Sequence, residues 1–278
     1  MFLNVISGIS SIRTGWAHNM PLIRRLYRIT ALAVWLAVVT ILSVPYRFRG
    51  WYGRKKISHI LRLWARGVGR IINLRVKVHG DPCQVPGGLV VSNHLGYIDI
   101  VVHGSVFPLR FTSSTETDSW PVVGPIVALS NPVLVNRFSP ARSKKAKRDY
   151  AKTIRRGMYL MVYPEGTSTD GKGGVLPFKS TCFEAVAQSD MPVIPVLIRY
   201  NEPEQRPTVC WYGDMTLVPH LWRILGYASI EADLFILPPV YSEGRSRKEL
   251  ASYVHDVMDA GYRSLIAAEK ALYTGGKI

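Results

Sequence analysis

The sequence predicts an α/β fold, with a mostly parallel central sheet flanked by helices and a separate N-terminal two-helix element. Two observations support this prediction. Beyond residue 80 the chain consists of short apolar runs separated by helical patterns, and several runs lack polar alternation, as do strands buried on both faces. Before residue 80 the chain is basic and contains one long apolar run. A chain of 278 residues is long enough for one large α/β domain and such an accessory element.

The longest apolar run covers residues 29–44 and has arginines on both sides. Its 16 residues fall just short of the roughly 17–25 that a membrane-spanning helix needs. Positive charge on both flanks gives no inside–outside bias. A cleaved signal peptide is disfavoured, because the run starts late and no small-residue cleavage site follows it. A spanning helix, a re-entrant membrane helix and a buried core helix are the alternatives.

A helix that begins at Ile57 would be amphipathic. Its apolar side chains fall on one face, whereas Arg62, Arg66 and Arg70 form a separate stripe at steps of four residues. An apolar face with a tryptophan beside an arginine stripe suits the headgroup boundary of an anionic membrane surface. A helix packed on the domain with a solvated basic side is the alternative. We therefore predict three parts: an N-terminal segment (1–20), a membrane-docking two-helix element (21–74) and a larger domain (75–278).

The larger domain is expected to alternate strands and helices, which implies a largely parallel sheet with helices on its faces. The predicted strands cover residues 89–91, 109–112, 133–135, 159–163, 193–198, 208–211 and 233–237. The predicted helices cover residues 120–129, 141–156 and 178–188, and a last helix begins at the capping box 246–249 and ends near residue 272.

The excess of positive charge belongs to the N-terminal part of the chain. The net charge is +16, and residues 1–80 contain 14 Lys or Arg and no Asp or Glu. The other 198 residues carry 21 basic and 19 acidic groups, so the body is close to balance. We expect no nucleic-acid partner, because the sequence shows no zinc-finger, RNP or helix-turn-helix pattern and an apolar run has no role in groove recognition. Three widely spaced cysteines form no CxxC site and favour a reducing environment.

Two polar clusters follow two predicted strands, as in the catalytic cleft of an α/β sheet. His94 and Asp99 come after the run at 89–91, and an acidic turn at 163–167 comes after the fourth run. A histidine, with an unperturbed pKa of about 6.5, is suited to removing a hydroxyl proton near neutral pH. A carboxylate on its other ring nitrogen would fix the tautomer and stabilise the imidazolium. A turn at Gly96 leading into a helix would bring the pair together.

These clusters belong to four sequence blocks that resemble the glycerolipid acyltransferase family, typified by 1-acylglycerol-3-phosphate acyltransferase. The family's pattern is Asn-His-x4-Asp, a segment ending in Arg, Phe-Pro-Glu-Gly-Thr-Arg, and an apolar strand containing Pro. The corresponding blocks, in the same order, are Asn93-His94 with Asp99, residues 132–137, residues 163–167 and residues 193–196. Residues 120–124 are similar to the element that precedes the arginine, and the resemblance covers roughly residues 70–240.

The resemblance implies that residues 75–278 form an acyltransferase domain. This domain would transfer a fatty acyl group from a thioester, acyl-CoA or acyl carrier protein, to the hydroxyl of 1-acyl-sn-glycerol-3-phosphate. The product would be phosphatidic acid, in phospholipid biosynthesis. The two N-terminal helices resemble the membrane-docking pair of bacterial members, which implies a protein of the bacterial inner membrane that faces the cytoplasm. Neither a metal nor a redox cofactor is expected.

The same resemblance assigns roles to individual residues. His94 would be the general base and Asp99 its orienting partner, and Arg137 would bind the acceptor's phosphate through its guanidinium fork. The residues that would shape the acceptor site are Glu165, Gly166 and Thr167. The basic helix at 141–156 would hold the phosphates of coenzyme A or the acidic face of acyl carrier protein, touch anionic lipid, or simply face solvent.

Two departures from the family's pattern bear on the acceptor. Ser168 stands where the family has Arg after Glu-Gly-Thr, and residues 113–115 contain no Lys where the family often has one. The loss of two cations weakens the case for a phosphate-bearing acceptor, unless Lys172 or Lys179 compensates. The turn after Ser168 is similar to that of members that acylate lyso-ornithine lipid, which carries no phosphate. This lipid is the alternative acceptor, and glycerol-3-phosphate acylation and a non-catalytic membrane-attached scaffold are the further alternatives.

Overall fold

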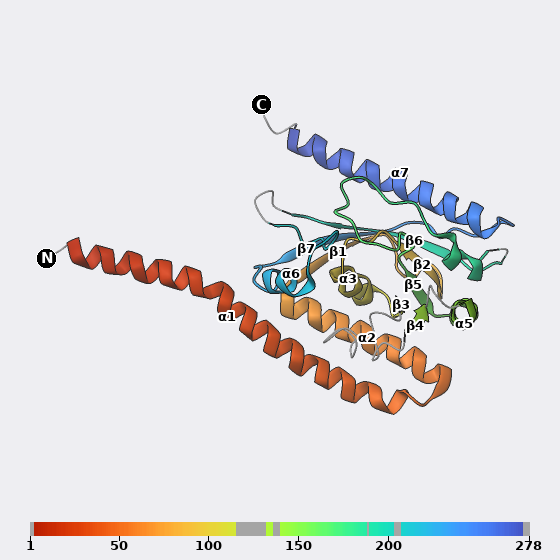
Figure 1. The fold of residues 1–278 in the computed structure, drawn as a ribbon, viewed down its shortest axis with the longest axis horizontal. Coiled ribbons are helices and arrows are strands. Elements are labelled where there is room, and N and C mark those ends of the chain that lie inside the picture. Colours follow the sequence, from red (N-terminus) through yellow and green to blue (C-terminus); the bar gives the residue numbers. More distant parts are fainter. Residues whose placement is uncertain (1–2, 115–131, 136–139, 188, 203–206, 275–278) are drawn as a thin grey trace.

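The computed structural model describes the backbone of residues 3–114, 132–135, 140–187, 189–202 and 207–274, and side chains within 21–113, 132–134, 145–187, 189–202 and 207–268. In this part of the chain, seven strands form one sheet with the order β1-β7-β6-β2-β5-β3-β4 (Figure 1). The strands are β1 (Leu74–His79), β2 (Gly88–Ser92), β3 (Leu109–Ser114), β4 (Val133–Val135), β5 (Tyr159–Val162), β6 (Val193–Tyr200) and β7 (Ile230–Ile236). Every neighbouring pair is parallel except β6 with β7, so the predicted mostly parallel sheet is confirmed.

Helices cover both faces of this sheet (Figure 1). Those on the first face are α2 (Gly50–Ile72), α3 (Ile98–Val106) and α6 (Leu217–Ile224), with α1 (Leu3–Ser43) packed outside α2. Those on the second face are α5 (Pro140–Arg155), the 3₁₀ helix η3 (Ser180–Ala185) and α7 (Arg247–Thr274). The predicted α/β fold with a two-helix N-terminal element is thus what the structure shows.

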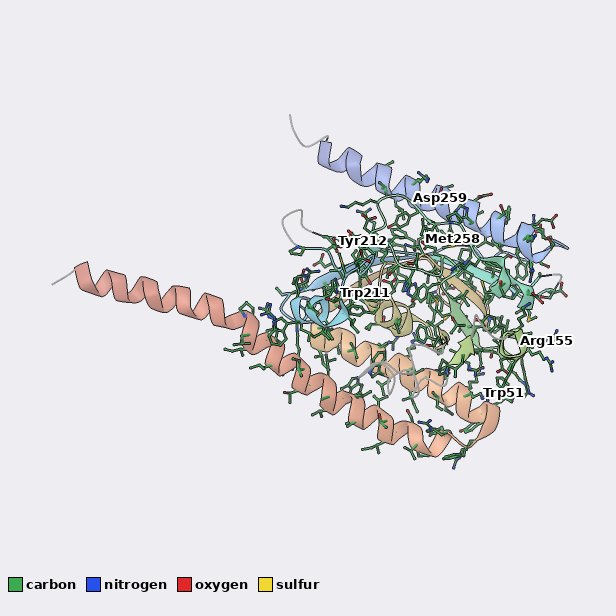
Figure 2. All side chains as sticks on the ribbon, viewed as in Figure 1. Trp51, Arg155, Trp211, Tyr212, Met258 and Asp259 are labelled. Carbon is green, nitrogen blue, oxygen red and sulfur yellow. The ribbon has the colours of Figure 1, made fainter. Side chains whose placement is uncertain are left out.

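Strand β2 illustrates how the sequence fills two cores. All five of its residues are buried, and successive side chains of a strand point to opposite faces. Val90 packs with α2 and α3, whereas Leu89 and Val91 pack with α5 and α7. On that second face Met258 of α7 is wholly buried against the sheet (Figure 2). A strand covered on both sides needs no polar alternation, which explains the apolar runs in the sequence.

The apolar N-terminal run lies in α1, which continues through the 3₁₀ turn η1 (Val44–Tyr46) into α2. Within the described residues one segment, Pro21–Tyr46, is long and apolar enough to cross a membrane, with a mean hydropathy of 2.0. Only 11% of its most apolar window is buried, so the buried core helix is the wrong alternative. The indole N–H of Trp35 donates to the carbonyl of Trp64 at 3.0 Å, and Gly67 leaves room for the Trp35 ring.

Arg28 connects helix α1 to the α/β domain through hydrogen bonds. Its side chain is buried, and its Nε donates to the carbonyl of Ile71 at the end of α2 at 3.0 Å. Its Nη1 donates to the carbonyls of Leu225 at 3.1 Å and Tyr227 at 2.6 Å, just beyond α6. One guanidinium therefore joins α1, α2 and α6, and its buried donors are satisfied by helix-end carbonyls that have no intrahelical partner.

The basic helix α5 is only partly free to contact a partner. Lys147 forms an ion pair with Glu184 at 2.6 Å. Trp51, at the start of α2, lies close to the end of α5 (Figure 2), and the cationic groups of Lys152 and Arg156 are 5.2 Å and 5.6 Å from its ring. These cation–π contacts connect the two basic helices.

The predicted secondary structure was wrong at two places and missed strand β1 and helix α6. Residues 208–211 form no strand, because the backbone N–H of Trp211 donates to the carbonyl of Leu95 in a loop rather than to a strand. The helix predicted at 178–188 is reduced to η3, since the N–H of Lys179 is held by the carbonyl of Pro164. Strand β1 was not predicted, although its side chains alternate. The helix predicted at 120–129 lies outside the described residues.

Candidate active site

His94 and Asp99 lie at the carboxyl end of β2, where the chain turns into α3. Nδ1 of His94 is 2.8 Å from Oδ2 of Asp99. The same oxygen accepts the backbone N–H groups of Leu95 at 2.7 Å and Gly96 at 3.0 Å. A Cβ on Gly96 would lie 2.9 Å from the backbone nitrogen of Trp211, so this turn requires glycine. The turn at Gly96 therefore brings the two predicted residues together.

Asp99 is wholly buried and fully hydrogen-bonded. Its second oxygen, Oδ1, accepts the hydroxyl of Tyr200 at 2.6 Å, so a tyrosine, two backbone amides and an imidazole all donate to one carboxylate. A buried charge is tolerable only with such donors. Because Asp99 accepts from Nδ1 of His94, the proton of the neutral ring lies on Nδ1 and Nε2 keeps its lone pair. The His94 side chain is 22% exposed, so a substrate can reach it.

Tyr163 and His103 contact the His94–Asp99 pair. The Tyr163 ring stacks on the His94 ring with centroids 4.1 Å apart. His103, one helical turn after Asp99, donates Nδ1–H to the Asp99 carbonyl at 2.6 Å, and its Nε2 is 2.9 Å from the hydroxyl of Ser92. Burial lowers the pKa of His103 to about 4, so this imidazole is neutral at physiological pH. Burial and the nearby charge of Asp99 raise the pKa of Tyr163 well above its ordinary value.

The side chain of Glu165 contacts the backbone of the loop that carries His94. Its Oε1 accepts the N–H of His94 at 2.8 Å, and its Oε2 accepts the N–H of Leu176 at 3.3 Å. The side chain is 5% exposed. Burial raises its pKa to about 7, against the lowering effect of the two N–H donors. Glu165 thus joins the two polar clusters and holds His94 in position.

Lys179 supplies a cation beside the turn at Gly166. Gly166 has φ +73°, and a Cβ there would lie 2.3 Å from Nζ of Lys179, so the ammonium group crosses the turn where a side chain would otherwise be. The backbone N–H of Lys179 donates to the carbonyl of Pro164 at 2.9 Å, which fixes this approach. Thr167, next in the turn, is exposed. Arg137 lies outside the described residues.

Residues 208–211, which were predicted as a strand, border the loop that carries His94. Ser168 donates its hydroxyl to the carbonyl of Trp211 at 2.5 Å, and the N–H of Thr169 donates to the carbonyl of His94 at 2.9 Å. On the other side Asn93 exchanges two hydrogen bonds with the backbone of Ile198 in β6, at 3.0 Å and 2.9 Å. The loop that carries His94 is therefore held by both of its neighbours.

Sequence reasoning did not identify Tyr200 and His103 as parts of this site. The sequence could have indicated His103, because it follows Asp99 by four residues and so lies on the same face of a helix. No local pattern indicates Tyr200, since it lies 101 residues from Asp99, to which its hydroxyl donates. Strand β6 brings it to that carboxylate.

Comparison with known proteins supports an acyltransferase. Residues 75–199 match the family model described as Acyltransferase. The chain is 35% identical to a lyso-ornithine lipid O-acyltransferase of Rhodobacter capsulatus over 199 residues, which cover 69% of this chain and 71% of the relative. It is 31% identical to a 1-acyl-sn-glycerol-3-phosphate acyltransferase of Neisseria meningitidis, over 72% of this chain and 78% of the relative.

The fold has a counterpart among solved structures. The crystal structure of the 1-acyl-sn-glycerophosphate acyltransferase PlsC from Thermotoga maritima superposes with a TM-score of 0.62 at 24% identity, over 88% of this chain and 96% of that one. At this identity the likeness concerns the fold. Together with the matched family model and the two relatives above 30% identity, the four sequence blocks lead to one conclusion: the chain belongs to the glycerolipid acyltransferase family and is an acyltransferase.

Proposed function

We propose that this acyltransferase moves a fatty acyl group from a thioester to the hydroxyl of a membrane lysolipid, with His94 as general base. The observation that carries the proposal is the contact between His94 and Asp99, which leaves Nε2 of His94 as the proton acceptor. Histidine in this arrangement is suited to general base catalysis near neutral pH. The reaction draws on no metal or redox cofactor, because the thioester itself provides the leaving group.

The chemistry proceeds in two proton transfers. Nε2 of His94 takes the acceptor's hydroxyl proton as the hydroxyl oxygen attacks the thioester carbonyl. Asp99 stabilises the imidazolium that forms, and the tetrahedral intermediate collapses with cleavage of the C–S bond. The imidazolium then returns the proton to the thiolate, so that the products are an ester and a free thiol. Acyl-CoA and acyl carrier protein both fit this scheme as donors.

The first acceptor we propose is 1-acyl-sn-glycerol-3-phosphate, with phosphatidic acid as product. Arg137 is the proposed phosphate ligand from the second sequence block. The ammonium group of Lys179 over Gly166 is the specific observation in favour, since it replaces a cation that Ser168 does not supply. Glu165, Gly166 and Thr167 form the turn against which this acceptor would bind.

The second acceptor is lyso-ornithine lipid. Ser168 directs its hydroxyl to the carbonyl of Trp211, so this position contributes neither a cation nor a free donor to a phosphate. The relative from Rhodobacter capsulatus carries this lipid in its name. One lysine is enough for the carboxylate of such a lipid, whereas a phosphate is commonly held by several cations.

The acceptor would reach the site from the membrane. Between residues 21 and 43, where its side chains are described, helix α1 exposes apolar residues, among them Ile23, Leu26 and Ile41. Helix α6 lies beside it, because Arg25 of α1 donates Nε–H to the carbonyl of Trp222 at 2.9 Å. The exposed apolar residues of α6 extend this surface. We propose that α1 and α6 face the bilayer, that basic residues beside them meet anionic headgroups, and that the protein lies in a bacterial inner membrane facing the cytoplasm.

An acylation assay tests both the reaction and the acceptor. The purified protein in detergent would receive labelled acyl-CoA or acyl carrier protein with either lysophosphatidic acid or lyso-ornithine lipid. His94→Ala should abolish the product, whereas His59→Ala, at an exposed position of α2, should leave it unchanged. The acceptor that is consumed identifies the substrate. No product from either lipid with folded protein would contradict the proposal and favour a scaffold.

A further inference from the structure

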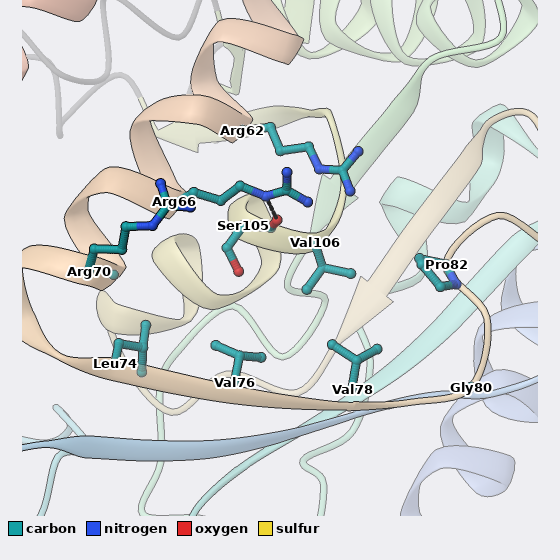
Figure 3. Close-up of a pocket in the computed structure, with 11 residues that line it drawn as sticks. Arg62, Arg66, Arg70, Leu74, Val76, Val78, Gly80, Pro82, Ser105 and Val106 are labelled. Atoms are coloured by element: carbon teal, nitrogen blue, oxygen red, sulfur yellow. Dashed lines mark hydrogen bonds between the residues drawn. The ribbon is translucent and has the colours of Figure 1, made fainter.

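A groove separate from the catalytic pair lies between α2 and β1. Its volume of about 570 Å³ is in the range of small-molecule sites, roughly 300–1,000 Å³. Figure 3 shows the side chains that line it: Arg62, Arg66 and Arg70 on α2, and Leu74, Val76 and Val78 on β1.

The groove lies away from His94. It reaches Ser105 at the end of α3, whereas Asp99 is in the first turn of that helix; six residues of α-helix span about 9 Å. It ends near Pro82, whose carbonyl is 3.4 Å from the hydroxyl of Tyr159, the first residue of β5. This end of the groove therefore lies at the edge of the sheet where the parallel strands β2 and β5 begin. The loop that carries His94 lies at the opposite edge, where these strands end.

The wall of the groove carries three like charges. Arg62, Arg66 and Arg70 follow one another at steps of four residues, a spacing at which like charges repel. None of the three forms an ion pair with a carboxylate in the part of the chain that the structure describes. Arg66 donates its Nε–H to the carbonyl of Ser105 at 2.9 Å. The Nε atom of Arg62 is buried and has no hydrogen-bond partner among the described residues, which is costly unless an acceptor binds there.

The floor of the groove is apolar. Among the described strands β1 lies at the edge of the sheet and pairs only with β7. Its residues Leu74, Val76 and Val78 face α2 across the groove. Val78 is 38% exposed. Cations above and aliphatic side chains below match a ligand with an anionic head and a hydrocarbon chain.

We propose that this groove binds one anionic phospholipid molecule, with its phosphate against Arg62 and Arg66 and an acyl chain along Leu74, Val76 and Val78. The bound lipid would anchor α2 at the headgroup level, so the inference rests on the proposed membrane function. Charge complementarity supports a phosphate, and the aliphatic floor supports a lipid over the polar arm of coenzyme A. The groove also adjoins the helix pair whose outer member, α1, exposes its apolar residues.

Native mass spectrometry of the full-length protein in non-ionic detergent tests this. Phosphatidylglycerol would be titrated beside phosphatidylcholine, and we expect one phosphatidylglycerol to be retained with about tenfold higher affinity. The variant Arg62→Gln/Arg66→Gln/Arg70→Gln should lose this preference. Its matched control is Arg47→Gln/Lys55→Gln/Lys56→Gln, which removes the same charge from exposed positions outside the groove and should retain the lipid.

A second variant keeps all charges. Val78→Trp would fill the groove from its half-exposed floor, and it should release the lipid with the arginines intact. The proposal would be overturned if the control variant lost phosphatidylglycerol equally, or if the wild type retained phosphatidylcholine equally. It would also be overturned if Val78→Trp bound the lipid normally, or if coenzyme A displaced the lipid. His94→Ala distinguishes the proposed reaction from the proposed lipid site, since it should abolish acylation and retain the lipid. An inactive wild type that still retains the lipid would contradict the proposed reaction alone.

Discussion

The carboxylate of Asp99 lies 2.8 Å from the imidazole of His94, yet most of its hydrogen bonds come from elsewhere. Two backbone amides and the hydroxyl of Tyr200 donate to the same group at 2.6–3.0 Å. The carboxylate is therefore held in place independently of the histidine. The imidazole has one orientation in which it can donate to this acceptor, and that orientation presents Nε2 outward for proton transfer.

Replacing Asp99 with asparagine should abolish most activity with little change of shape. With its oxygen in the place of Oδ2, the amide would still accept the two backbone N–H groups, but it is neutral and could not stabilise the imidazolium of His94. We expect kcat to fall by about 10³–10⁴-fold. The measurement is steady-state acylation, with Asp190→Asn, an exposed aspartate, as control. An Asp99→Asn variant that remains folded and fully active would exclude the proposed role of the pair.

Glu165 should make the stability of the protein depend on pH. Its folded pKa of about 7 lies above the ordinary 4.5, because burial penalises the charged form. The folded state therefore binds the proton more tightly, and the stabilisation present below pH 4.5 is lost as the pH rises through about 7. The difference corresponds to about 3 kcal/mol in the free energy of unfolding.

Denaturant unfolding at pH 5, 6, 7 and 8 measures this effect. The buried His103, whose pKa is lowered to about 4, acts in the opposite direction as the pH falls below 6.5, so the effect of Glu165 is measured as the difference between the wild type and Glu165→Gln. The wild type should lose free energy of unfolding relative to this variant as the pH rises through about 7. The amide cannot accept at both positions, so the variant should also be less active through displacement of His94. The lowered pKa values of Asp233 and Asp259 act only at more acid pH, below their ordinary 3.8. An unchanged slope in the variant would show that Glu165 titrates normally.

Lys179 should determine acceptor affinity. Lys179→Gln removes the cation over Gly166, and we expect KM for lysophosphatidic acid to rise about tenfold with kcat little changed, because a charge-assisted hydrogen bond contributes about 1.5–3 kcal/mol. Lys248→Gln is the matched control, since Lys248 is an exposed lysine on α7. If both variants behave as the wild type does, the phosphate is bound elsewhere.

The exposed face of α6 should contribute to membrane binding. Val218 is 75% exposed and Trp222 is 41% exposed, next to α1. Val218→Ser/Trp222→Ser should weaken vesicle binding about tenfold or more, because burial of each apolar side chain contributes about 1.5–3 kcal/mol. Vesicle flotation measures this, with Tyr253→Ser on the opposite face of the molecule as control: Tyr253 is 43% exposed on α7. Equal loss in both variants would point to a general effect on folding.

Local patterns in the sequence predicted most of the strands and helices and the contact between His94 and Asp99. Uninterrupted apolar runs identified strands β2, β5 and β6 because both faces of these strands are buried. The capping box at Ser246 predicted the start of α7, and its reciprocal hydrogen bonds with Glu249 are present at 2.8 Å and 3.4 Å. The spacing of His94 and Asp99 with Gly96 between them predicted their contact, since one turn is enough to make it.

Tertiary structure alone decided which distant residues complete the site. Tyr200 reaches Asp99 because β6 lies beside β2, and Lys179 reaches Gly166 because its backbone bonds to Pro164. The run at 208–211 is as apolar as a strand, but it packs beside the catalytic loop instead of joining the sheet. The sequence by itself determined which short segments are helical or extended and which residues carry reactive groups, because these depend on near neighbours. The order of the strands and the contacts across them depend on how both faces of the sheet are buried, and no local pattern specifies that.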